Sequence, residues 1–132
     1  MKYFTINELV ASSEAVKRKI DNTPPPPVRV KLAGLINNLL DPIRERWGKP
    51  VTVNSGYRCP LLNKTVGGVP ASQHVKGEAA DITAGNPEKN RQLFDSIVSG
   101  GFDFDQLIDE KGFRWIHISY SAGKNRKQIL HL

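Results

Sequence analysis

The sequence predicts a single α+β domain over residues 1–132, in which helices pack on a small antiparallel sheet. Two observations predict this class. Helical periodicity dominates residues 1–50, whereas short alternating segments typical of strands follow mainly over residues 51–120, so the two kinds of element are segregated along the chain. The hydrophobic share of 39% and the charged share of 24% are ordinary for a chain that buries one core.

The first 50 residues predict helices interrupted by a proline linker. Thr5 begins the first helix with the spacing of a capping box, and a second short helix is expected from about Ser13 to Ile20. The run Pro24–Pro27 should form a stiff, extended connector. Apolar residues then recur at three- and four-residue steps over Val28–Trp47, which predicts a long helix that Pro42 should bend.

The remainder of the chain predicts strands around one helix and one long loop. Strands are expected at Val51–Asn54, Ala79–Thr83, Phe104–Glu110 and Arg114–Tyr120, and a helix at Pro87–Ser99. Residues 55–77 are rich in Gly, Pro, Asn and Ser and should form an ordered loop with about one turn of helix, and such loops are often functional. Residues 121–132 are expected to be a basic tail with a frayed end that includes His131.

Charge and composition argue against several classes of function. The net charge of +6 would attract polyanions, but the charge is scattered and no aromatic residues are interleaved with it, so no nucleic-acid partner is expected. Neither a signal peptide nor an apolar run long enough to span a bilayer is present, which predicts a cytoplasmic protein without membrane insertion. The single cysteine, Cys59, rules out an internal disulfide, and we expect a monomer.

The histidines offer one candidate for chemistry. His74 precedes a predicted strand, Asp81 lies within it, and a catalytic zinc ion takes about three such ligands and leaves a position for water. Side chains alternate along a strand, so His117 should face away from the core side that Ile116 and Ile118 occupy. From spacing alone two interpretations stand: a zinc site, or a loop histidine, a turn aspartate and a satisfied strand histidine.

Three motifs, in order along the chain, resemble the M15 zinc peptidases. The segment from Ser72 to Asp81 (SQHVKGEAAD) is similar to the family signature S-x-H-x-x-G-x-A-x-D, the segment SGYR at 55–58 resembles S-G-[YF]-R, and WIH at 115–117 resembles the closing W-x-H. The similarity runs from about Phe4 to Tyr120 and looks closest to the short, M15A-like branch. It implies the fold shared by the hedgehog domain and the DD-peptidases.

The resemblance also implies roles for individual residues. His74, Asp81 and His117 would bind Zn²⁺. Arg58 would hold a substrate carboxylate or polarise the scissile carbonyl, work that suits a bidentate guanidinium, although a surface salt bridge is its plainer interpretation. Ser72 would bind substrate or brace the ligand loop, and a simple turn residue is the alternative.

The chain departs from the family pattern at the general base. Many relatives carry a glutamate three residues before the last ligand, where this chain has Arg114, which cannot act as a base. The nearest upstream acid, Glu110, is therefore the expected base, and Asp109 should point to the other face of its strand. An exposed carboxylate at the end of a hairpin is the alternative interpretation of Glu110.

The function implied by the resemblance is hydrolysis of a peptide bond in bacterial cell-wall peptidoglycan, of the D-Ala-D-Ala carboxypeptidase or endopeptidase type. Peptidoglycan peptides would be the partners, and a phage-type lysis route would release the protein to the wall. A second class of function is a non-catalytic, zinc-containing wall-binding module of the same fold. Arg114 in place of the glutamate favours that alternative.

Overall fold

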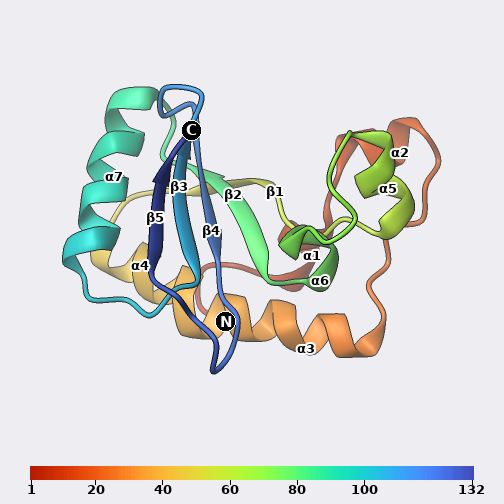
Figure 1. Cartoon of the computed structure of the whole chain (residues 1–132), viewed down its shortest axis with the longest axis horizontal. Helices are drawn as coiled ribbons and strands as arrows, with labels where there is room; N and C mark the ends of the chain where they lie inside the picture. Colours follow the sequence, from red (N-terminus) through yellow and green to blue (C-terminus); the bar gives the residue numbers. More distant parts are fainter.

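A five-stranded sheet forms the centre of the protein (Figure 1). The computed structural model describes all of residues 1–132. The strands are β1 (Thr52–Ser55), β2 (Ala79–Thr83), β3 (Gln106–Glu110), β4 (Trp115–Ser119) and β5 (Gln128–His131), in the spatial order β1-β2-β4-β3-β5. All neighbours pair antiparallel except β3 and β5, which are parallel. Helices together with a mostly antiparallel sheet confirm the predicted α+β class.

The helices are α1 (Ile6–Val10), α2 (Ser13–Lys17), α3 (Pro26–Leu35), the π-helical turn η1 (Ile36–Leu40), α4 (Asp41–Trp47), α5 (Pro60–Thr65), α6 (Gln73–Lys76) and α7 (Pro87–Ser99). The capping box predicted at the first helix is present, since the Thr5 side chain accepts from the backbone N–H of Glu8 and the Glu8 carboxylate accepts from that of Thr5. Asn86 caps α7 by accepting from the N–H of Lys89 at 2.8 Å.

The long helix begins two residues earlier than predicted, and its hydrogen-bond pattern changes just ahead of Pro42. Pro26 and Pro27 begin α3 instead of extending the linker, because the first turn of a helix needs no donor at those positions. Ahead of Pro42 the helix widens into η1, and the N–H of Asp41 reaches back five residues to the carbonyl of Ile36. A π-helical turn relieves the clash of the proline ring with the preceding turn, so the helix continues through Pro42.

One face of the sheet and the helices enclose the core. The core side chains of the sheet are Ala80, Ile82, Leu107, Ile116 and Ile118. Those of the long helix are Leu32, Leu35, Ile36, Leu39, Leu40 and Ile43, and α7 adds Leu93, Phe94 and Ile97. Each such Leu, Ile or Phe contributes about 1.5–3 kcal/mol on burial. The opposite face of the sheet carries the polar side chains of Asp81, His117 and Glu110 together with Ile108.

Two segments are more ordered than the sequence predicted. The expected loop at residues 55–77 contains two short helices, α5 and α6, where about one turn was expected. The expectation of a frayed C-terminus is wrong, because β5 extends the sheet. Its attachment depends on distant partners: the N–H of Gln128 donates to the carbonyl of Asp105, and that of Leu132 to the carbonyl of Asp109. His131 Nδ1 forms a hydrogen bond with the Asp109 carboxylate.

A buried asparagine joins the N-terminal helices to the segment that follows β1. The Asn22 side chain donates to the carbonyls of Val10 (2.9 Å) and Tyr57 (3.0 Å), and its oxygen accepts from the N–H of Cys59 (2.7 Å). Because these bonds use both ends of one amide, they tie the end of α1 and the chain at Asn22 to residues 57–59. No helix of the protein has the length and apolar character needed to span a membrane.

Candidate functional site

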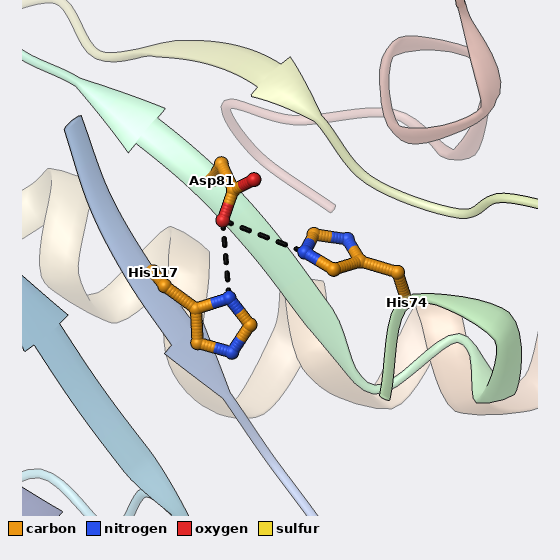
Figure 2. Close-up of side chains that lie close together, drawn as sticks. All are labelled: His74, Asp81 and His117. Atoms are coloured by element: carbon orange, nitrogen blue, oxygen red, sulfur yellow. Dashed lines mark hydrogen bonds and ion pairs between the residues drawn. The ribbon is translucent and has the colours of Figure 1, made fainter. Parts of the chain in front are cut away.

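Three side chains that are far apart in the sequence meet on the open face of the sheet. Asp81 of β2 and His117 of β4 lie opposite each other in the antiparallel ladder, and His74 of α6 reaches the same point from the side (Figure 2). Asp81 Oδ1 lies 3.1 Å from His117 Nδ1 and 3.4 Å from His74 Nε2. One ligand atom from each residue lies within 4.8 Å of the others. The structure thus brings together the three residues singled out from the sequence.

The backbone around α6 fixes the orientation of the His74 ring. His74 Nδ1 lies 2.7 Å from the carbonyl oxygen of Gly56, which can only accept, so Nδ1 donates its proton there and Nε2 is the nitrogen that faces Asp81. The Ser72 hydroxyl caps α6 by accepting from the N–H of His74 at 3.2 Å, and the N–H of Arg58 donates to the His74 carbonyl at 3.2 Å. The residue can therefore present only one nitrogen to the site.

Gly77 ends α6 and allows it to pack closely on α3. Its φ of +75° lies in the left-handed region, which residues with a Cβ adopt at a cost. A Cβ at this position would lie 2.8 Å from Val28 Cγ1 and 2.9 Å from the Val28 carbonyl oxygen. Glycine is needed here for its backbone conformation and for its lack of a side chain.

The carboxyl group of Asp81 is held in its charged form. Burial by itself would raise the pKa of Asp81, but hydrogen bonds from His117 and His74 outweigh that effect and hold the pKa well below its usual range. The side chain is only 18% exposed. A carboxylate with one oxygen between two imidazole rings is therefore present throughout the neutral pH range.

This donor set fits a divalent metal ion. Two imidazole nitrogens and one carboxylate oxygen form a ligand set suited to catalytic zinc, which keeps a fourth position open. The side chains of His74 and His117 are 4% and 14% exposed, so the ligand atoms are largely but not completely shielded from solvent. The proton on His74 Nδ1 donated to a backbone carbonyl is also the outer contact that metal-binding histidines commonly make.

A cleft of about 810 Å³ opens over the three side chains, and Arg58 lines it. Arg58 Nη2 lies 3.4 Å from the hydroxyl of Ser72, and its Nε is buried without a partner. Burial lowers the pKa of Arg58, and the nearby Asp81 carboxylate offsets only part of that effect. The guanidinium makes no salt bridge to a carboxylate, so donors remain for an anionic or carbonyl oxygen of a ligand.

Glu110 lies in the same cleft, on the face of the sheet that carries His117. Its Oε2 accepts a hydrogen bond from Trp115 Nε1 at 3.0 Å. The two residues are paired across β3 and β4, and Asp109 is buried on the opposite face, as strand alternation predicts. Arg114 is exposed and does not line the cleft, so Glu110 is the acid of this hairpin that faces it.

Sequence reasoning missed the other end of the cleft. Arg126 forms two hydrogen bonds with the Asp105 carboxylate, at 2.8 and 2.9 Å, and the Gln73 amide donates to it at 2.8 Å. Hydrogen bonds from Arg126 lower the pKa of Asp105. Asp105 and Arg126 both line the cleft. The only sign of this in the sequence was the basic character of residues 121–132, which suggested a solvated tail.

Comparison with known proteins identifies the family of the chain. The profile of the peptidase M15 family matches residues 2–119. The zinc D-Ala-D-Ala carboxypeptidase of Streptomyces albus G is 46% identical over 48 residues, which are 36% of this chain and 19% of that protein. The match thus spans about a fifth of that relative's length. Because the family profile covers nearly the whole chain and the resemblance of the three motifs is thereby confirmed, the protein belongs to the peptidase M15 family.

Proposed function

We propose that the protein is a zinc-dependent peptidase that hydrolyses a peptide bond in bacterial cell-wall peptidoglycan, of the D-Ala-D-Ala carboxypeptidase or endopeptidase type. The observation that carries the proposal is the convergence of His74, Asp81 and His117 beneath a cleft of about 810 Å³. Membership of the family and the partial match to a zinc D-Ala-D-Ala carboxypeptidase support the reaction class.

His74, Asp81 and His117 would hold the zinc ion, through His74 Nε2, a carboxylate oxygen and an imidazole nitrogen. When bound, zinc supplies Lewis acidity toward the scissile carbonyl and makes a nucleophilic water available at neutral pH. The role of the protein is to present these ligands in one orientation. The Gly56 carbonyl does this for the His74 ring, and the ladder of β2 and β4 does it for the other two.

Glu110 would act as the general base and then as the general acid. Its carboxylate takes a proton from the attacking water and returns it to the leaving amine, and the Trp115 indole holds the carboxylate in the cleft. Arg58 would donate to the carbonyl oxygen as negative charge develops on it, or to a substrate carboxylate, and Ser72 supports the guanidinium. The buried Nε of Arg58, which has no partner, suits this task because a fixed donor needs no reorganisation when charge develops.

The alternative function is a zinc-containing module that binds the wall without cleaving it. Arg114 at the usual position of the base is the observation in its favour. Incubation with defined wall peptides separates the two functions, since a binding module retains the peptide and releases no amine.

The metal assignment is tested by the zinc content of purified variants, measured by plasma mass spectrometry. Wild type should bind about one zinc ion per chain, as expected for a single site with three protein ligands. His74→Ala and Asp81→Ala should each lose most of this zinc. His131→Ala is the matched control, because that ring lies outside the candidate site and should leave the zinc content unchanged. Unchanged zinc in both site variants would exclude the proposed ligands.

The reaction is tested by mass spectrometry of the products of wall peptides of known sequence. Loss of a single terminal residue indicates a carboxypeptidase, and two internal fragments indicate an endopeptidase. Zinc-loaded protein that releases no product from any of these peptides would contradict the proposed function. Circular dichroism of each variant verifies that lost activity is not lost folding.

A further inference from the structure

We propose that Lys76 and Lys124 form a subsite for a carboxylate carried by the acyl side of the substrate, at the end of the cleft remote from Glu110. This inference rests on the proposed function, because it names a feature of the peptide that the same cleft would bind. It concerns selection among substrates and adds no step to the reaction.

The cleft has two chemically different ends. At the β3–β4 hairpin lie Glu110 and Trp115, and His117 follows two residues along β4. Past the far end of β4 the cleft is bordered by Ser121 and Lys124, with Lys76 at the end of α6. A peptide that lies along β4 over the metal ligands would therefore place one side at the hairpin and the other side at the lysines.

Charge pairing within the cleft leaves these two lysines without partners. Of the acids that line the cleft, Glu78 is paired with Lys31 (3.6 Å) and Asp105 with Arg126 (2.8 Å). Asp81 is engaged by the two histidines. The remaining acid, Glu110, lies at the hairpin. Lys76 and Lys124 are exposed, and neither takes part in any of the salt bridges of the protein.

The turn that carries Lys124 is held rigidly. The N–H of Lys124 donates to the Ser121 carbonyl (2.8 Å), and the N–H of Ser121 donates to the Asn125 side chain (2.8 Å). The bidentate pair of Arg126 with Asp105 then ties the turn to the sheet. The family match ends at residue 119, so this turn lies beyond the matched residues. A preorganised turn loses less entropy when its lysine binds an anion.

A second hollow continues the cleft beyond the lysines. It has a volume of about 370 Å³ and lies against α3 at Val30, Gly34 and Asn38. It shares Lys124, Ser121 and the Lys31-paired Glu78 with the main cleft. The two hollows together have room for a peptide that extends well past the scissile bond. Glu110 would protonate the leaving amine at the hairpin end of the cleft, so the acyl side of the substrate would lie at the lysines. A carboxylate on that side would neutralise the unpaired positive charge of Lys76 and Lys124.

The test compares two acetylated wall pentapeptides that differ only in whether the α-carboxylate of their glutamyl residue is free or amidated. Binding is measured by isothermal titration calorimetry with zinc-loaded Glu110→Gln protein, so that the peptide is not consumed. Protein with both lysines should bind the peptide with the free carboxylate more tightly than the amidated one. Lys76→Gln or Lys124→Gln should each reduce this ratio of affinities about three-fold, the range of an exposed ion pair. Lys89→Gln removes the same charge from α7, outside the cleft, and should keep the preference.

The preference should also fall in about 0.5 M salt, because exposed ion pairs are screened. Equal binding of the two peptides, no binding of either, or an unchanged preference in both lysine variants would overturn the inference. Failure of the proposed function gives a different result: wild-type protein would cleave neither peptide, whatever the binding preference.

Discussion

Replacing Gly77 with alanine should destabilise the protein and release its metal. The substitution forces a residue with a Cβ to a φ of +75°, which costs about 1–2 kcal/mol. The new methyl group would also lie 2.8 Å from Val28 Cγ1 and 2.9 Å from the Val28 carbonyl oxygen. Overpacking of this kind costs about 1–3 kcal/mol more. The free energy of unfolding should therefore fall by about 2–5 kcal/mol, the sum of these two ranges.

Gly112 provides a matched control for the backbone cost. Its φ of +68° is nearly the same, but a Cβ there would meet nothing within 4 Å, so Gly112→Ala should cost about 1–2 kcal/mol. Urea unfolding followed by circular dichroism gives both values. Zinc content should fall only in Gly77→Ala, since α6 carries His74 and must move to accept the methyl group. Equal destabilisation by the two substitutions would refute the close-packing argument.

Three further results are expected. Chelation of the metal should lower the melting temperature in scanning calorimetry, and added zinc should restore it. The reason is that zinc at 100 times its Kd adds about 2.7 kcal/mol to the free energy of unfolding. An unchanged melting temperature would speak against a zinc ion that binds only the folded state. Glu110→Gln should reduce kcat about 10²–10⁴-fold while zinc content stays constant, and wild-type turnover would remove Glu110 from the mechanism. The lowered pKa of Asp105 means that its carboxylate stabilises the fold above its unfolded pKa of about 3.9, and that this contribution is lost as the pH falls through the lower folded value. The gap in unfolding free energy between wild type and Asp105→Asn should thus shrink in acid, and a constant gap would contradict the assignment.

Local rules were enough to predict the face of the sheet on which the candidate site lies. The two-residue period of a strand separates His117 from Ile116, and Glu110 from Asp109, without knowledge of the strand order. The same rules located α7, which begins with Pro87 at its first position and is capped by Asn86. These features depend only on neighbours in sequence, which a single chain displays directly.

Features that depend on distant partners could not be predicted in the same way. Strand β5 exists because its backbone pairs with β3 and because Arg126 is tied to Asp105, and neither partner is evident from residues 121–132 alone. The π-helical turn before Pro42 likewise belongs to a helix whose side chains pack in the core on both sides of the proline, so the helix continues past it. Both surprises come from tertiary contacts that outweigh local preference.

The amide of Asn22 has a consequence for chimaeric proteins. Since it bridges the first helices and the residues after β1, exchanging the N-terminal helices with those of another family member would succeed only if the donor supplied a matching amide. The proline run Pro24–Pro27 would be an obvious place to join segments of two proteins. A junction there, however, would separate Asn22 from its hydrogen-bond partners at Tyr57 and Cys59. The helices and the half of the chain that holds the histidines should melt in one transition, so neither is a portable module.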